Sequence, residues 1–383
     1  MIFAVSTRRM LKRKIQERAR ELGFTLCGFA PVEPLPREQF FTEWLAQGHA
    51  GEMQYLARAP ERRLNPLSIF PQAKSVICLA YPYAPPRLPD IDWRQELRGR
   101  IAAYAAGIDY HDVIKTKLDL LVQFLADLSP GLWARTYVDT GPLLEREWAH
   151  RSGLGWFGKN TMLLHKQVGS WFFLAEILVS LELEEEGVPG AHCGKCTSCL
   201  DGCPTGALEE GYVLKAPLCI SYLTIEHRGP IPHALRPQIG NWIFGCDVCQ
   251  EVCPWNEKFG QPREDLVNEL FPSLLALLSL DDEGFRARFG RTALRRTKRR
   301  GLLRNVAIAL GNSKNPRAIP PLRPALQDPE PLIRSHVAWA LGELSDKAAR
   351  TALQQQLPRE QDAHVRAEIL TALGEKKPPE DVS

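Results

Sequence analysis

The sequence predicts a multidomain α+β protein with a mixed α/β domain at residues 1–185, a two-cluster ferredoxin-like domain at 186–260 and an all-α repeat domain at 261–383. The chain has 383 residues, more than one hydrophobic core of roughly 150 residues usually serves. Eight of its ten cysteines lie between positions 193 and 253, and a helical motif recurs after them. With 44% hydrophobic and 24% charged residues, the composition excludes a disordered or fibrous protein.

The N-terminal region alternates short strand patterns with a long helical one. Residues 75–81 (SVICLAY) and 134–138 (ARTYV) are β-branched or apolar runs that end at proline or at turn residues, which is typical of strands. We expect a third strand at 171–180. Residues 111–128 have apolar side chains at helical spacing and predict a helix.

The N-terminus resembles the start of an export signal. Residues 7–12 (TRRMLK) look like a twin-arginine motif, but charged residues follow where such a signal needs an apolar stretch. The longest apolar run, 170–183, contains Glu176 and falls short of the roughly 20 residues of a spanning helix. We therefore expect a charged amphipathic helix that opens a cytoplasmic protein without membrane contact.

The cysteine spacing predicts two [4Fe–4S] clusters. The run C-x2-C-x2-C-x3-C-P that starts at Cys193 is the spacing of bacterial two-cluster ferredoxins, in which the fourth cysteine binds the other cluster. The second run has Ile243 where its first cysteine should stand, and Cys219 is the nearby thiol that replaces it. Exchange of the fourth ligands gives two complete sets, Cys193, Cys196, Cys199 and Cys253 for one cluster, and Cys203, Cys219, Cys246 and Cys249 for the other.

Zinc ribbons and disulfides are the alternatives for these cysteines. Zinc sites use two C-x2-C pairs separated by a longer spacer, and disulfides need an oxidising compartment. The two remaining cysteines, Cys27 and Cys78, stand among apolar residues, so we expect them to be buried and inert. No G-x-G-x-x-G follows a predicted strand, so nothing supports a dinucleotide-binding fold.

The last third contains an internal repeat. Residues 303–311 (LRNVAIALG) align with 333–342 and 365–374, and each unit ends in a glycine that suits a helix C-cap. The period of about 30 residues is typical of stacked helical hairpins of the HEAT type. We expect a small stack of helices that packs against the rest of the protein.

Positive charge is concentrated in the same region. The net charge is only +3, but residues 261–383 contain 20 Lys and Arg against 16 Asp and Glu, and residues 285–304 contain eight Arg and one Lys with no acid. Such a strip can be a solvated helix face, yet the lack of acids favours a polyanion. The candidates for contact with such a polyanion are Arg295, Arg296, Lys298, Arg299 and Arg300.

Together these segments resemble epoxyqueuosine reductases, the cobalamin-dependent iron–sulfur enzymes that complete the tRNA nucleoside queuosine. The resemblance covers the whole chain. Besides both cysteine runs, it rests on the segments 100–104 (RIAAY), 107–111 (GIDYH), 137–142 (YVDTGP), 145–146 (ER), 153–160 (GLGWFGKN) and 219–226 (CISYLTIE). It implies a nitroreductase-like N-terminal domain that holds base-off cobalamin beside one cluster. The implied reaction reduces an epoxide on the wobble nucleoside of a tRNA anticodon loop to an alkene.

The resemblance also implies roles for two residues. Asp139 fits the acid that protonates the departing epoxide oxygen, for which burial should raise its pKa. An Asp before Thr-Gly-Pro can instead be a simple turn residue. Tyr104 is a second candidate proton donor, or else a core aromatic. His111 is not assigned as a cobalt ligand, because Ile114 stands where the D-x-H-x-x-G cobalamin motif has its glycine.

Further cobalamin contacts are expected at six positions beside Asp139. Gly-rich backbone allows close approach to a large ligand near 159–160, and the others flank the second cysteine run or match the family. The positions are Arg58, Lys159, Asn160, Ser221, Cys246 and Asp247.

Two other functions remain open from the sequence. A reductive dehalogenase also pairs cobalamin with two clusters, but carries an export signal and no repeat region. A non-enzymatic electron carrier or RNA-binding iron–sulfur protein would not hold cobalamin. For the favoured function we expect a monomer that receives electrons from a cellular donor and binds tRNA.

Overall fold

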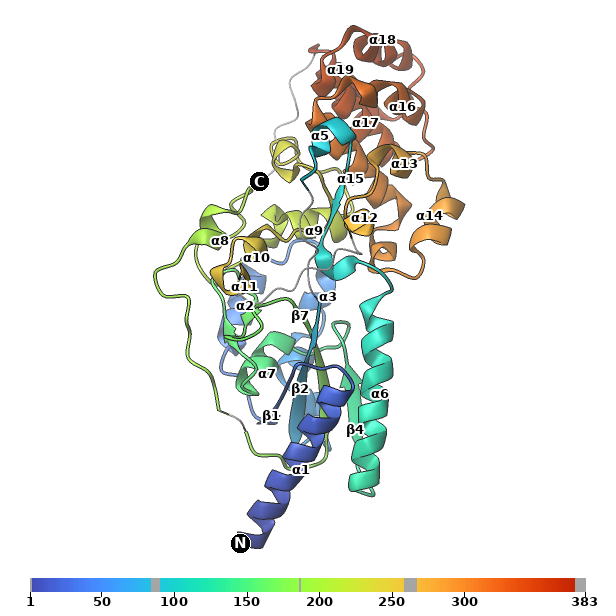
Figure 1. Ribbon diagram of the computed structural model, residues 1–383. Coiled ribbons are helices and arrows are strands. Elements are labelled where there is room, and N and C mark those ends of the chain that lie inside the picture. Colours follow the sequence, from blue (N-terminus) through green and yellow to red (C-terminus); the bar gives the residue numbers. More distant parts are fainter. Residues whose placement is uncertain (1, 84–89, 186, 258–266, 376–383) are drawn as a thin grey trace.

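The computed structural model describes residues 2–83, 90–185, 187–257 and 267–375 (Figure 1). The two domain boundaries expected from the sequence fall on residue 186 and within 258–266, outside the described residues. No described helix is both long and apolar enough to cross a membrane.

The N-terminal region begins with a long helix and is built around four strands. Its elements in chain order are α1 (Ile2–Glu21), β1 (Leu26–Pro31), α2 (Glu38–Ala46), α3 (Gln54–Ala57), α4 (Pro60–Leu64), β2 (Ser75–Pro82), α5 (Trp93–Glu96), β3 (Arg100–Ile101), α6 (Tyr110–Leu128), β4 (Ala134–Tyr137), α7 (Glu145–Arg151), β5 (Trp156–Phe157), β6 (Leu163–Leu164) and β7 (Phe172–Val179).

The central sheet is antiparallel, with strand order β1-β2-β7-β4. Side chains of β2 alternate between two cores: Ile77 and Leu79 pack with α1 and α6, whereas Val76 and Cys78 pack with α7 on the other face. Both faces are therefore buried, which explains why 75–81 is an unbroken apolar run. Figure 1 shows α1 and α6 side by side along one side of the strands.

The expected strands and helix are confirmed as β2, β4, β7 and α6. The sequence does not predict strand β1, because Gly28 interrupts its pattern of apolar residues. A Cβ at Gly28 would lie 1.9 Å from the carbonyl oxygen of Ser152, so the close approach of β1 to the end of α7 requires glycine there. Cys78 is buried as expected, and Cys27 is half-buried.

The cysteine-rich region consists of short elements joined by turns. They are α8 (Ser198–Asp201), α9 (Ile220–Ile225), β8 (Trp242–Phe244), α10 (Val248–Glu251) and α11 (Pro254–Glu257). Helices α8 and α10 each carry a cysteine and pack against each other. Strand β8 pairs in parallel with β3, which joins this region to the N-terminal one.

The C-terminal region is all helical, as expected. Its helices are α12 (Val267–Leu270), α13 (Leu274–Leu278), α14 (Asp282–Phe289), α15 (Lys298–Ser313), α16 (Ile319–Ala325), α17 (Pro331–Leu344), α18 (Lys347–Gln356) and α19 (Ala363–Ala372). The repeated motif lies in α15, α17 and α19, which pack on one another in sequence. Figure 1 shows them stacked away from the sheet.

The expected role of two repeat glycines is wrong. Gly311 and Gly342 lie inside α15 and α17, whose C-caps are Lys314 and Ser345. A Cβ at Gly311 would lie 2.8 Å from the Trp339 ring, so these glycines allow neighbouring helices to approach closely. Only the third unit ends in a left-handed glycine, Gly374.

The repeats and the cysteine-rich region share one hydrophobic core. Its buried residues come from 97–105, from 216–244 and from the helices after residue 270. Arg304, which the sequence places at the end of the basic strip, lies in this interface with only 1% of its surface exposed. It donates hydrogen bonds to backbone carbonyls of Leu223, His227 and Gly229. Arg304 is therefore a structural residue, and it does not contribute to a basic surface.

Candidate active site

The first set of four cysteines lines one cavity. Cys193, Cys196, Cys199 and Cys253 surround a space of about 210 Å³, together with His192, Trp255 and Lys159. Burial raises the pKa of Cys199 to about 11, and the neighbouring Cys253 and Cys193 contribute to this rise. The four thiols are thus close enough to influence one another and face a common space.

The second set lines a larger cavity of about 330 Å³. Cys203, Cys219, Cys246 and Cys249 lie on its wall. Burial raises the pKa of Cys249 well above its ordinary value, with further contributions from Cys246 and Cys219 and a smaller one from Cys199 of the first set. The two cavities are therefore neighbours.

These two groups fit the chemistry of iron–sulfur clusters. Four cysteines around each cavity match the four thiolate ligands of a [4Fe–4S] cluster. Among the described residues, no three His, Cys, Asp or Glu side chains converge as they would around a single metal ion.

Lys159 and Asn160 hold the loops that carry the cysteines. Lys159 Nζ donates hydrogen bonds to the carbonyls of Gly194 and Cys196, at 2.9 and 2.8 Å. Asn160 is buried, donates to the carbonyl of Cys249 at 3.1 Å and lines both cavities. Their donors therefore already have partners in the backbone of the cysteine loops.

The rest of the larger cavity is mostly aromatic and apolar. Its wall includes Tyr83, Tyr104, Tyr110, Met162, Phe172, Phe173, Leu208 and Leu214, beside the polar residues Arg146, Ser221 and Asp247. Asp247 is buried and accepts a hydrogen bond from the backbone of Ala103 at 2.7 Å, so it positions the segment that carries Tyr104. Burial raises the pKa of Asp247 to about 7. A wide apolar wall of this kind suits a flat macrocycle with polar groups at its edge.

Asp139 lies next to this wall. Its Oδ2 accepts a hydrogen bond from the Tyr110 hydroxyl at 2.8 Å, and Nε2 of His111 lies 3.5 Å from the same oxygen. At 3.5 Å the histidine contact is an ion pair rather than a hydrogen bond of normal geometry. Tyr110 stacks on His111 and on Phe173, so the rings fix the direction of both groups.

The expected rise in the pKa of Asp139 is not found. Burial does raise it, but the contacts with His111 and Tyr110 outweigh burial, and the net pKa lies below the ordinary value. Conversely, the pKa of His111 is raised: burial lowers it, but contacts with Asp139 and Asp109 raise it more. The two contacts therefore favour the carboxylate form of Asp139 and the protonated form of His111.

The sequence gives no sign of a role for Tyr110 and places His111 only at a helix start. His111 does lie in the first turn of α6, where Asp109 is the N-cap and accepts from the His111 backbone at 3.1 Å. As a motif, Asp-Tyr-His reads only as an incomplete cobalamin signature. Its relation to Asp139 depends on the packing of α6 beside β4.

Tyr104 is a half-buried wall residue whose phenol stays protonated. Burial raises its pKa well above 10, and the charge of Asp139 adds to this. Its ring makes edge contacts with Tyr110 and Phe173. Arg58, by contrast, is exposed and does not belong to the lining of either cavity.

Two acidic side chains lie behind Asp139. Glu145 Oε1 accepts a hydrogen bond from the backbone N–H of Asp139 at 2.5 Å. Glu176, in the middle of β7, is fully buried, and burial followed by the charge of Glu145 raises its pKa well above the ordinary value. Burial also raises the pKa of Glu145, to about 8. The pair therefore retains a proton at neutral pH.

Comparison with known families identifies this arrangement. A model of epoxyqueuosine reductase QueG (DUF1730) matches residues 63–140, a 4Fe-4S double cluster binding domain matches 192–256, and HEAT repeats match 291–374. The epoxyqueuosine reductase of Alicycliphilus denitrificans is 41% identical over 351 residues, which cover 86% of this chain and 97% of the relative. That of Escherichia coli K12 is 35% identical over 359 residues, with coverage of 92% and 94%.

The chain belongs to the epoxyqueuosine reductase family. It is an oxidoreductase, and membership of this family sets aside the alternatives of a dehalogenase and of a non-enzymatic carrier. An epoxyqueuosine reductase crystallised with an epoxyqueuosine-modified tRNA-Tyr stem loop is 33% identical, with a TM-score of 0.89 and coverage of 96% of this chain and 99% of that one. The Bacillus subtilis enzyme, with its catalytic aspartate loop swung out of the active site, has 32% identity, a TM-score of 0.89 and coverage of 97% and 100%.

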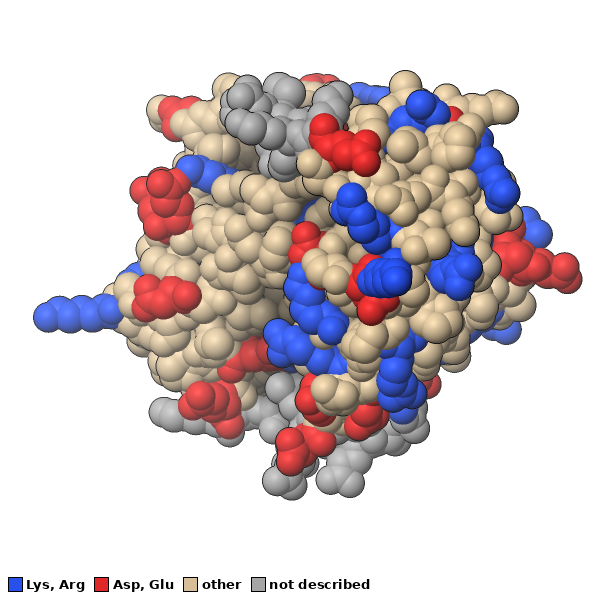
Figure 2. All heavy atoms as spheres, turned by 90° about the horizontal axis from the view of Figure 1, so that it is seen from above, with Lys and Arg blue, Asp and Glu red and all other residues tan. Residues whose placement is uncertain are grey.

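In this family member the basic strip does not follow one helix. It runs from the end of α14 through a turn and the short helix Ala293–Thr297 into α15, because Thr292 caps that short helix and breaks the continuity. Arg299 is only 12% exposed and forms a salt bridge with Asp328, so its guanidinium is already engaged. Figure 2 shows lysines and arginines gathered on one half of the face seen from above.

The remaining members of the strip are exposed near the candidate site. Arg295 Nη2 lies 3.0 Å from Asp109, and Arg296 Nε lies 2.5 Å from Glu226. Arg300 makes only a long contact of 3.7 Å with Glu330, and Lys298 is exposed. Arg296 also contributes to the low pKa of Asp139, after the contacts with His111 and Tyr110. The basic surface therefore reaches the edge of the site.

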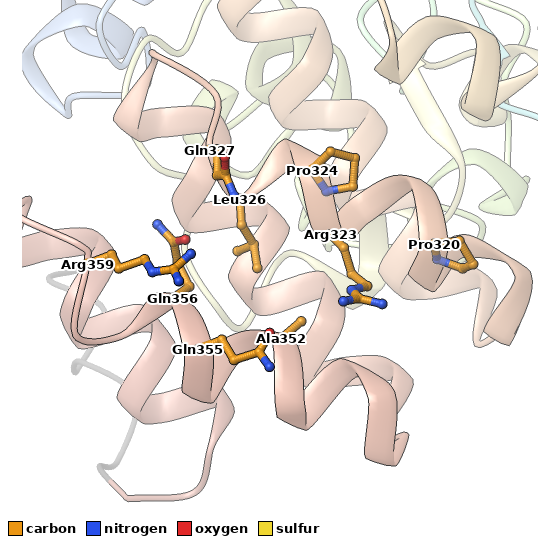
Figure 3. A pocket seen from close by; sticks show the side chains of 9 residues that line it. All are labelled: Pro320, Arg323, Pro324, Leu326, Gln327, Ala352, Gln355, Gln356 and Arg359. Carbon is orange, nitrogen blue, oxygen red and sulfur yellow. The ribbon is translucent and has the colours of Figure 1, made fainter.

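Another groove of about 360 Å³ lies between α16 and α18 (Figure 3). Arg323, Arg359 and three glutamines line it with apolar residues. These groups can bind an anion but neither carry electrons nor exchange protons at neutral pH, so we place no chemistry there.

The buried Glu176 predicts a pH-dependent stability. In the unfolded chain this carboxyl ionises above its ordinary pKa of about 4.3, whereas burial keeps it protonated, so the wild type loses stability as the pH rises. Glu176→Gln removes this loss. We expect the free energy of unfolding of the variant, relative to the wild type, to increase between about pH 5 and about pH 8, by at most about 1.4 kcal/mol per pH unit.

Urea unfolding at a series of pH values measures this difference. Glu38→Gln, which alters an exposed glutamate on α2, is the control and should follow the wild type at every pH. A constant difference between Glu176→Gln and the wild type would show that Glu176 is ionised in the folded protein.

Proposed function

We propose that the protein reduces epoxyqueuosine to queuosine at the wobble position of tRNA, the last step of queuosine synthesis, with cobalamin and two [4Fe–4S] clusters as cofactors. The observation that carries the proposal is the arrangement of eight cysteines around two adjacent cavities, the larger of which also meets Tyr110, the hydrogen-bond donor to Asp139. The family relationship supports the substrate, since relatives are named for this reaction.

The proposed cluster ligands are the two sets deduced from the spacing. Cys193, Cys196, Cys199 and Cys253 bind one cluster, and Cys203, Cys219, Cys246 and Cys249 bind the other. Contact between α8 and α10 brings the sets together, so that an electron can pass from the first cluster, nearer the surface, to the second. We propose the division 1–185, 186–260 and 261–383 for the cobalamin, cluster and repeat domains, with a nitroreductase-like first domain, a monomeric cytoplasmic protein and a cellular electron donor.

The residues that line the larger cavity suit the binding of cobalamin. The aromatic side chains offer a flat surface to a corrin, and Ser221, Asn160 and the backbone around Cys246 and Asp247 provide polar groups for its amide side chains. Reduced cobalt, when bound there, supplies a strong nucleophile for the epoxide carbon. Lys159 acts mainly by ordering the first cysteine loop. Arg58 has no place in this proposal, because it is exposed outside the lining.

Proton delivery is the task of Asp139 and its neighbours. Conversion of the epoxide to an alkene consumes two electrons and two protons and releases water. A bound ligand that excludes water from Asp139 raises its pKa, so that the proton held by His111 can pass to the carboxylate and on to the departing oxygen. The Tyr110 hydroxyl steadies the carboxylate during this transfer. Tyr104 is a half-buried neighbour whose ring packs against Tyr110, and its phenol is the second candidate proton donor.

The exposed basic residues are the proposed tRNA contact. Arg295 and Arg296 lie at the edge of the site, and Lys298 and Arg300 continue the exposed strip from there. Phosphate contacts along this strip would orient a single unstacked nucleotide of an anticodon loop. Arg299 is not part of the proposed tRNA contact, because its guanidinium is paired with Asp328.

Iron content tests the ligand sets. We expect reconstituted protein to bind four irons per cysteine set, Cys193→Ala to lose one cluster, and Cys219→Ala to lose the other. Cys27→Ala, outside both sets, is the control and should keep the full iron content. Iron and labile sulfide analysis measures this. Full iron in Cys219→Ala would show that Cys219 is not a ligand.

Asp139→Asn tests proton delivery. The amide keeps the shape and the Tyr110 contact but cannot carry the proton, so cobalamin should bind as in the wild type while turnover falls by about 10² to 10⁴. Asp112→Asn changes an exposed aspartate on α6 and should leave turnover unchanged. Wild-type turnover of Asp139→Asn would reduce Asp139 to a turn residue.

Neutralising Arg295, Arg296 and Arg300 to Gln tests the tRNA surface. Binding of tRNA should weaken, and the slope of its log affinity against log salt concentration should flatten by about 0.7–0.9 for each phosphate that the variant no longer neutralises. Reduction of a free epoxy-nucleoside should change much less. The control is Arg323→Gln with Arg359→Gln, which removes charge from the groove in Figure 3. Equal effects on both substrates would make the strip structural.

A further inference from the structure

The Asp139 loop has a strained backbone that needs an external hold. Asp139 has a φ of 56°, in the left-handed region that residues other than glycine adopt infrequently. Such a conformation persists only where neighbours enforce it. Two side chains outside the loop contact its backbone: the Glu145 carboxyl accepts the Asp139 N–H, and Arg63 donates to the carbonyl of Gly141 at 3.3 Å.

The Glu145 contact is the shorter one and comes from a rigid element. Glu145 opens α7, which packs against β1, β2 and β7, so its carboxyl is anchored to the sheet. Asp139 itself has no such anchor, because it follows the end of β4. The position of its backbone therefore depends on the atom that Glu145 supplies, while Tyr110 and His111 contact its carboxylate.

Burial of Glu176 bears on how the Glu145 carboxyl can lie next to the Asp139 carboxylate without electrostatic repulsion. Both of its oxygens are buried and have no hydrogen-bond partner of normal geometry among the described residues, while Glu145 is its nearest acidic neighbour. An ionised Glu176 in that position would be prohibitively unstable. With Glu145 and Glu176 both protonated, Asp139 is the carboxylate that faces His111 and Tyr110.

We propose that Glu145 is a positioning residue that holds the Asp139 loop in the active site, and that Glu145 and buried Glu176 each keep a proton, so that the hold carries no extra negative charge. The inference rests on the proposed role of Asp139. In the Bacillus subtilis relative the catalytic aspartate loop is swung out of the active site, which is the movement that such a hold opposes.

The groups that face Glu145 and Glu176 are consistent with a neutral charge on both carboxyls. Asp139 and Arg146 interact electrostatically with Glu145, and so does the guanidinium of Arg63. Cys78 of β2 faces Glu176. Arg146 itself donates to the carbonyl of Thr161 rather than to Glu145. Within the described part of the chain, neither arginine donates a hydrogen bond to the Glu145 carboxyl, so a proton of its own is what keeps it neutral.

Hydrogen–deuterium exchange of the Asp139 amide tests the hold in the full-length protein with its clusters, and needs no turnover. We expect this amide to exchange at least about tenfold faster in Glu145→Ala, because it loses its acceptor. Glu145→Gln keeps an acceptor oxygen at the same place and should stay as protected as the wild type. Glu145→Asp, one methylene shorter, should lose protection, and it serves if the alanine variant does not fold.

Two further variants separate the parts of the proposal. Glu176→Met and Glu176→Gln both leave the Glu145 acceptor in place, so the Asp139 amide should stay protected in each. Glu147→Gln alters the next buried glutamate of α7, which pairs with Arg37, and should change nothing at Asp139.

Turnover gives a second readout. Glu145→Ala should lower kcat by about tenfold or more with little change in KM, and Glu145→Gln should restore most of it. Unchanged exchange at Asp139 in both Glu145→Ala and Glu145→Asp would overturn the proposal. If the wild type does not reduce epoxyqueuosine, the proposed function fails, but the exchange experiment still decides whether Glu145 holds the loop.

Discussion

Two adjacent buried side chains of α15 determine where the second cysteine set lies. Arg304 donates to three carbonyls at the end of α9, and Asn305 donates to the carbonyls of Thr224 and Ile243. Cys219 directly precedes α9 and Cys246 follows β8, so both thiols are placed by a helix of the repeats. Burial lowers the pKa of Arg304 to about 9, which reflects the cost of burying a cation that has only carbonyl dipoles to bind it.

This constraint gives the repeats a role beyond tRNA contact. The same interface contains Glu368, which binds Arg236 and His233 from the segment between α9 and β8. Removal of one partner from such a buried pair leaves an uncompensated charge, so the interface holds or fails as a unit. The helices that present basic residues to solvent therefore also keep the cysteine loops in register with the N-terminal domain.

The carboxyl groups of the candidate active site are likewise controlled by burial and by their charged neighbours. Asp139 is stabilised as a carboxylate by His111 and Tyr110, while Glu145 and Glu176 stay protonated because the sheet buries them. One group is thus held ionised and two are held neutral within a few residues. Water exclusion by a ligand shifts this balance towards proton transfer, since desolvation always favours the neutral acid.

The sequence by itself determined three of the four strands of the central sheet, the long helix, the repeats and the grouping of eight cysteines, since strand and helix periodicity and cluster spacing are local properties of the chain. It could not show that Gly311 packs against Trp339, that Arg299 and Arg304 are engaged, or that Tyr110 and His111 meet Asp139. Each of these depends on residues far apart in the chain. Only the tertiary structure decided them, because burial and charge pairing are set by which helices and strands pack together, and no local pattern records that.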